Sequence, residues 1–233
     1  GSSQAEQAIN NIEIIMVLDV SGSMLGQKMT NLKAAANEFV DTVLDQDTEN
    51  RVSIGIVPYN GQVNLHQNMA DLFARVDDHN EPEVNCFDLP GSTYGSLALS
   101  RTIGLPVTAH ADTFTPQSST GYVGPSDANA QPVVTNQWCP PYSNPRGDGV
   151  RSTNFVRSPT NDRIALRNHI SNLVAVGATS INAGMKWGMA LLDPSANPIY
   201  TGMVAAGQTP SYFSNRPFAY DDRDAMKIVV LMT

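Results

Sequence analysis

The run IEIIMVLDVSGS, residues 12–23, decides the fold expected for this chain. Residues 12–18 are almost all apolar, which is typical of a strand buried on both faces of a parallel sheet. After Asp19 and a Ser-Gly-Ser turn, residues 27–45 repeat apolar side chains at helical spacing, and residues 52–57 form a second apolar run. A strand, a helix and a strand in this order predict a right-handed βαβ unit.

The rest of the chain predicts further elements of the same kind. Pro58 should end the second strand, and the dipeptide Asn60-Gly61 indicates a hairpin turn into a short strand over 62–65. Sequence patterns then predict helices over 162–174 and 181–192, a polar loop over 193–226, and a buried strand over 227–232. The expected fold is therefore α/β, with a mostly parallel, Rossmann-like sheet flanked by helices.

Residues 66–160 interrupt this pattern. Residues 82–159 hold ten of the fifteen prolines and both cysteines, without a long periodic segment. We interpret 66–160 as an inserted, loop-rich subdomain with little core, short strands such as Val133-Val134, and a Cys86–Cys139 disulfide that indicates an oxidising compartment. Closing a loop of about 53 residues would contribute roughly 4 kcal/mol in the chain-entropy model. Two free, buried thiols in a cytosolic protein are the alternative.

The predicted organisation has three parts. Residues 1–11 form an N-terminal tail or the remnant of a tag, 12–65 and 161–233 form the main domain, and 66–160 form the insertion. The formal net charge is −8 and no basic cluster occurs, which argues against nucleic acid and anionic membranes as partners. No run approaches the roughly 18 apolar residues of a membrane span.

The loop after the first strand carries the candidate site. Open α/β sheets bind ligands beyond the carboxyl ends of their strands, where Asp19 lies. The Asp19 carboxylate and the hydroxyls of Ser21 and Ser23 can converge because Gly22 lets the backbone turn, and such oxygens suit Mg2+ or Mn2+. A hydrolase with Ser21 or Ser23 as nucleophile would need a positioned base, and the sequence has no Gly-x-Ser-x-Gly elbow or paired histidine. Binding rather than catalysis is therefore expected.

These residues resemble a known family. Asp-x-Ser-x-Ser after an apolar strand, at residues 19–23, is similar to the first motif of the metal-ion-dependent adhesion site (MIDAS) of von Willebrand factor A (VWA) domains. Thr179, in the run GATSINAG, resembles the second motif. The resemblance implies that Ser21, Ser23 and Thr179 contact Mg2+ (or Mn2+ or Ca2+), and that Asp19 acts largely through water. It also implies an open coordination position for an acidic group of a protein partner.

The resemblance also sets expectations for the end of the chain. In the family, an Asp follows the strand that here ends at Thr233, and further strands and helices come after it. We therefore expect a domain that is incomplete at its C-terminus. Such a species should bind Mg2+ weakly and present 227–232 as an exposed apolar edge that pairs with other chains.

A second resemblance is narrower. The runs VPYN (57–60), CP (139–140), MKWGM (185–189) and LDP (192–194) resemble the VWA region of bacterial TadG-like proteins of tight-adherence pilus assembly. This implies a periplasmic or cell-surface domain, anchored by a membrane helix outside this sequence, that binds a pilus or envelope component or a surface ligand. The alternative is a degenerate VWA module that binds no metal and acts as a structural spacer.

Overall fold

The computed structural model describes residues 11–76, 83–107, 114–115, 131–132 and 139–233. The predicted strand Val133-Val134 lies outside these residues, as does the predicted tail except for Asn11, which begins the first strand.

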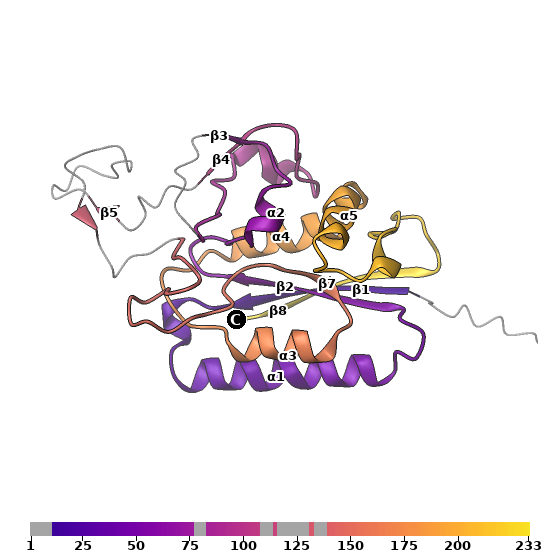
Figure 1. Ribbon diagram of the computed structural model, residues 1–233, viewed down its shortest axis with the longest axis horizontal. Coiled ribbons are helices and arrows are strands. Elements are labelled where there is room, and N and C mark those ends of the chain that lie inside the picture. The colour runs from indigo at the N-terminus through magenta and orange to yellow at the C-terminus, as the bar shows by residue number, and fades with distance from the viewer. Residues whose placement is uncertain (1–10, 77–82, 108–113, 116–130, 133–138) are drawn as a thin grey trace, which may run out of the picture.

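A four-stranded sheet forms the centre of the molecule, in the order β7-β2-β1-β8 (Figure 1). Its strands are β1 (Asn11–Asp19), β2 (Val52–Tyr59), β7 (Arg157–Thr160) and β8 (Ala225–Met232). Both β2 and β8 pair with β1 in parallel, whereas β7 pairs antiparallel with β2. The prediction of an α/β fold with a mostly parallel sheet is therefore confirmed.

Helices cover both faces of this sheet (Figure 1). The side chains of β1 alternate between two apolar clusters, as the period of a strand requires. Met16 and its neighbours on one face pack against α1 (Gln27–Asp45) and α3 (Arg163–Ser171). Val17, on the other face, packs in the cluster of α4 (Ile181–Leu192) and α5 (Asn197–Ala205). The predicted helices at 27–45 and 181–192 thus have the predicted bounds.

Two glycines allow α4 to lie directly on the sheet. A Cβ atom on Gly184 would lie 2.6 Å from Cδ1 of Tyr59, and one on Gly188 would lie 2.6 Å from Cγ2 of Val17. Both separations are far below an ordinary carbon contact. Only glycine therefore permits this approach, which brings the N-terminal half of α4 to the ends of β1 and β2.

Three local predictions were wrong. Pro58 does not end β2, because β7 pairs with β2 only at Ile54 and Ile56, so Pro58 lies where a missing N–H is tolerated. The segment 60–65 forms no hairpin with β2, because Asn64 and Leu65 instead make isolated bridges with Cys86 and Val156.

The third wrong prediction is the polar loop at 193–226, which contains α5 and two 3-10 helices, η4 (Pro194–Ala196) and η5 (Ser211–Phe213). Pro198 lies in the first turn of α5, where proline is tolerated. Gly202 faces Leu72, and a Cβ there would lie 2.7 Å from it, so this glycine serves packing and does not break the helix.

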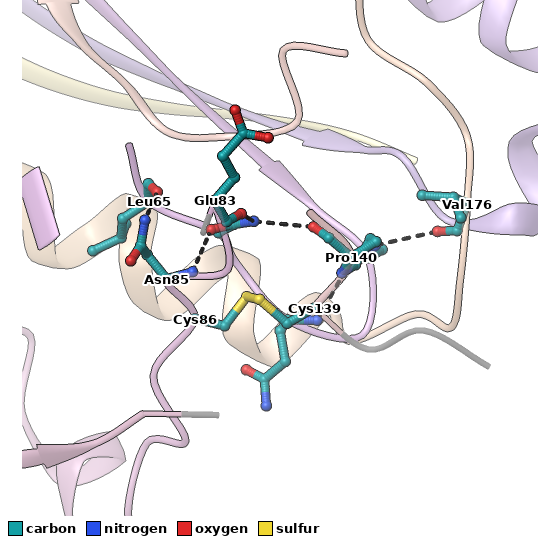
Figure 2. The surroundings of a disulfide bond; sticks show 10 residues. Leu65, Glu83, Asn85, Cys86, Cys139, Pro140 and Val176 are labelled. Atoms are coloured by element: carbon teal, nitrogen blue, oxygen red, sulfur yellow. Dashed lines mark hydrogen bonds between the residues drawn. A yellow bond between two sulfur atoms is a disulfide. The ribbon is translucent and has the colours of Figure 1, made fainter. Parts of the chain in front are cut away.

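The predicted disulfide is present. Cys86 and Cys139 are both buried and their Cα atoms lie 6.0 Å apart (Figure 2). The side chain of Asn64 reinforces this junction, because it donates to the backbone oxygens of Glu83 and Pro140. Beside it, Asn85 donates to the backbone oxygen of Leu65 (Figure 2).

The predicted insertion at 66–160 is more closely built into the fold than expected, because its last residues form β7 of the central sheet and its apolar side chains before residue 108 join the core on the α4 face. Phe73 and Phe87 lie within 6.1 Å of the Trp187 ring of α4, centroid to centroid. Lys186 is buried, and its ammonium donates to the backbone oxygens of Ser96, Leu97 and Ala98, which holds that loop on α4. The remaining short elements are η1 (Gly22–Met24), α2 (Gln67–Ala70), β3 (Arg75–Val76), η2 (Gly91–Gly95), β4 (Leu105–Pro106), β5 (Phe114–Thr115) and β6 (Gln131–Pro132).

Candidate metal site

The candidate site lies at the carboxyl ends of β1 and β8. The chain leaves β1 through α1, on one face of the sheet, to reach β2 on one side. It returns by way of α4, on the opposite face, to place β8 on the other side of β1. The strand order therefore reverses at β1 and β8, and such a reversal opens a crevice for ligands at the carboxyl ends of the two strands.

Asp19 forms the base of this crevice. Asp19 is 3% exposed; its Oδ1 accepts a hydrogen bond of 2.8 Å from the Ser21 N–H, and its Oδ2 accepts one of 2.8 Å from the Thr233 hydroxyl. Within the described residues, no lysine, arginine or histidine forms an ion pair with Asp19. A buried negative charge thus has only neutral hydrogen-bond donors as partners, which favours a cation beside it.

The two serines of the first motif converge as predicted. The hydroxyl oxygens of Ser21 and Ser23 lie 3.1 Å apart, with Ser21 buried and Ser23 at the surface. The turn at Gly22 brings them together, and the Gly22 N–H donates to the backbone oxygen of Gly177 at 2.9 Å. A Cβ on Gly22 would lie 3.1 Å from that oxygen, so a larger residue would push the two loops apart.

Thr179 lies in the adjoining loop. Backbone bonds tie this loop to the end of β1, from the Val176 N–H to the oxygen of Val20 and from the Gly22 N–H to the oxygen of Gly177. Thr179 itself is exposed, and no hydrogen bond in the described part of the chain joins it to the other three predicted residues. The structure therefore brings Asp19, Ser21 and Ser23 together and holds the loop of Thr179 next to them, without a hydrogen bond from the Thr179 side chain to these three among the described residues.

Two residues of the site were not predicted from the sequence. Thr233 follows β8 and bonds to Asp19, whereas Tyr59 ends β2 opposite Asp19 in the sheet register. Tyr59 is fully buried. Burial raises the pKa of Tyr59, a hydrogen bond with the Thr233 hydroxyl lowers it, and the charge of the Asp19 carboxylate raises it further. The Tyr59 hydroxyl therefore lies within reach of both Asp19 and Thr233.

A groove of about 680 Å³ opens from this site along α1 and β8. Asp19, Ser23 and Thr233 line its polar end, and the stems of Met24, Leu32 and Leu231 line its apolar part. Lys28 is also at the groove, without an ion pair to Asp19.

The donor set fits a hard divalent cation. One buried carboxylate, two converging hydroxyls and a buried phenol are all oxygen groups, the type that Mg2+ and Mn2+ prefer. The described residues contain no cluster of three His, Cys, Asp or Glu side chains, so any cation here would rely on hydroxyls and water for most of its ligands. With a single acid, we expect weak binding.

Comparison with protein-family models and with curated proteins found no match. In the described part of the chain, none of the helices combines the length and apolarity needed to cross a membrane.

Proposed function

We propose that this chain is a VWA-type domain that binds a divalent cation and uses it to bind an acidic group of a protein partner. The observation that carries the proposal is the buried Asp19 carboxylate, which lacks a cationic partner and lies beside two converging serine hydroxyls at the crevice between β1 and β8. A crevice of this type is where open α/β sheets hold their ligands.

Each residue has a distinct part in this proposal. Ser21, Ser23 and Thr179 would supply hydroxyl ligands to Mg2+, Mn2+ or Ca2+, and Asp19 would hold the cation mainly through bound water. The cation would supply positive charge at the surface, where a carboxylate of the partner completes its coordination. Thr179 is exposed, and backbone bonds hold its loop beside the residues that follow β1.

We further propose that the domain works at the bacterial envelope in pilus assembly, as a TadG-like protein anchored by a segment outside this sequence. The Cys86–Cys139 disulfide supports this, because such bonds persist in the periplasm and at cell surfaces but rarely in the cytosol. Alkylation of free thiols tests the compartment, if cells are lysed directly into denaturant with the alkylating agent so that the buried cysteines are accessible. Full labelling of both cysteines before any reduction would contradict an oxidising compartment.

Titration of Mg2+ and Mn2+ onto the chain tests the site. Ser21→Ala and Asp19→Asn should each weaken binding by at least about tenfold, the loss typical when support of a metal site is removed. Thr179→Ala should weaken it too, if the loop closes on the cation. Asp222→Ala is the matched control: it removes a carboxylate that bonds only within the loop before β8, at the opposite end of the sheet. No binding by the unaltered chain would favour the alternative of a structural spacer without metal.

A further inference from the structure

A second pocket, of about 350 Å³, lies between α4 and residues 94–97 of the predicted insertion. Asn182, Met185 and Met189 line it at helical spacing, so they share one face of α4. On the other wall, the side chains of Tyr94 and Leu97 are 47% and 43% exposed. An accessible apolar hollow with a few polar groups is the kind of surface that binds a partner.

The base of this pocket is fixed in place and carries a positive charge. Lys186 is 2% exposed, and its ammonium donates to the backbone oxygens of residues 96, 97 and 98, which holds the two walls together. Among the described residues no carboxylate forms an ion pair with Lys186, and Asp193 acts on its charge only from a greater distance. The pocket is therefore preformed, and its charge favours an acidic segment over a neutral or basic one.

The pocket adjoins the candidate cation site through the start of α4. Gly184 lies against the ring of Tyr59, which is opposite Asp19 in the sheet, and Asn182 and Met185 on either side of this glycine line the pocket. Thr179 precedes Asn182 by three residues, so their Cα atoms are at most about 11 Å apart. An extended peptide advances about 3.3 Å per residue, and three or four of its residues therefore span from one site to the other.

We infer that this pocket receives an apolar side chain of the same partner segment whose carboxylate binds the cation, and that the insertion thereby helps to select the partner. This inference rests on the proposed function. The ligand is an acidic, extended protein segment with a large apolar side chain three or four residues from its acid. The cation binds the carboxylate, and the pocket distinguishes this segment from other acidic segments.

Fluorescein-labelled synthetic peptides serve as the probes. Each contains one Asp and one Leu in a Gly-Ser background, with the Leu one to five residues from the Asp on either side. Fluorescence anisotropy with the 233-residue chain in Mg2+ should show the highest affinity at a spacing of three or four residues. The gain over a peptide without Leu should be about tenfold, as expected for burying one leucine side chain. Replacing Asp by Asn in the peptide, or chelating Mg2+, should remove most of the binding.

Leu97→Asn tests the wall that the insertion provides. Lys186 bonds to the backbone oxygen of Leu97, so this variant keeps that contact and loses only the apolar side chain. Its affinity for the best peptide should fall about five- to tenfold, whereas its affinity for the peptide without Leu should not change. Ile164→Asn is the matched control, because Ile164 is an exposed apolar side chain of α3 on the opposite face of the sheet, and this variant should bind every peptide like the unaltered protein.

Calorimetric titration of Mg2+ onto the same three proteins separates this inference from the proposed function. Equal Mg2+ affinity in all three, with weaker binding of the best peptide in Leu97→Asn alone, supports the inference. Peptide affinity that does not depend on the spacing, or that is equal in Leu97→Asn and the unaltered protein, overturns the inference and leaves the cation site standing. Failure of the unaltered protein to bind Mg2+ overturns both.

Discussion

His169 should make the stability of this fold depend on pH. It lies in α3, is 4% exposed, and its Nε2 is 2.9 Å from the backbone oxygen of Phe155. Because a carbonyl can only accept, Nε2 must carry the proton of a neutral ring. Burial lowers the pKa of His169 from 6.5 to about 3, helped by repulsion from Arg157 and opposed by the bond to Phe155.

The sign and size of this pH dependence follow from the linkage between proton binding and unfolding. The folded protein disfavours the imidazolium, so the unfolded chain binds the extra proton between pH 6.5 and pH 3. The stabilisation is fully present above pH 6.5 and is lost as the pH falls toward 3. For these two pKa values, about 2 kcal/mol of unfolding free energy should be lost between pH 7 and pH 5.

Urea unfolding at pH 7 and pH 5 measures this loss. His169→Gln removes the titration but keeps an N–H that can donate to Phe155, and carboxylates common to both proteins cancel in the comparison. The unaltered protein should therefore lose about 2 kcal/mol more than the variant on acidification. His66→Gln is the control: His66 is only partly buried, although burial also lowers its pKa, so that variant should change the pH dependence less. Equal losses in the unaltered protein and His169→Gln would refute the reasoning.

Three other variants probe the packing around the site. Gly184→Ala should destabilise the fold by about 1 to 3 kcal/mol and weaken cation binding, because its Cβ would clash with the Tyr59 ring. Gly188→Ala should destabilise the fold by a similar amount and leave cation affinity unchanged. Equal effects of the two variants on cation affinity would contradict this expectation. Replacing both Cys86 and Cys139 by Ala should lower the unfolding free energy by up to about 4 kcal/mol, because the disulfide joins residues separated by 53 positions. A loss of less than about 1 kcal/mol in urea unfolding would contradict a stabilising role of the disulfide. Glu13→Gln removes the counter-charge of Lys227 in a buried pair and should lower the unfolding free energy by about 3 to 5 kcal/mol. Glu49→Gln, in an exposed pair with Arg51, should lower it by less than about 1 kcal/mol. Similar losses for the two variants would contradict a dependence on burial.

Local patterns predicted the parts of the site that lie in one stretch of chain. Asp19, Ser21 and Ser23 follow an apolar run directly, and their convergence requires only a turn at Gly22. The disulfide could also be predicted, because the chain contains only two cysteines and both flank a loop-rich segment.

Tyr59 and Thr233 could not be predicted in the same way, because their place depends on strand order. The βαβ pattern predicts that the strand at 52–57 runs parallel to the first strand, but no local pattern fixes the register that places Tyr59 opposite Asp19. Only the pairing of β2 and β8 on either side of β1 brings both ends to Asp19. The failed hairpin has a similar cause: Leu65 forms a bridge with Val156, which is distant in the sequence, in place of β2.

The buried charged groups at the two ends of the sheet differ in how fully they are paired, and this difference supports the location of the site. The buried cation Arg216 donates to the backbone oxygens of Ile12 and Arg51 and to the hydroxyl of Ser53, at the amino ends of the strands. Lys186 uses its three donors on three backbone oxygens. These groups stabilise the fold as it stands. At the carboxyl ends, by contrast, the buried Asp19 carboxylate forms no ion pair with any described residue.

A buried carboxylate that forms no ion pair with a described residue therefore lies at the crevice between β1 and β8. Packing does not require this charge, since Asn at position 19 would fill nearly the same space. A hydrated divalent cation would supply the missing counter-charge. The folded chain is thus under-satisfied at the place where ligands bind in an open α/β sheet, and this is the physical reason to seek its function there.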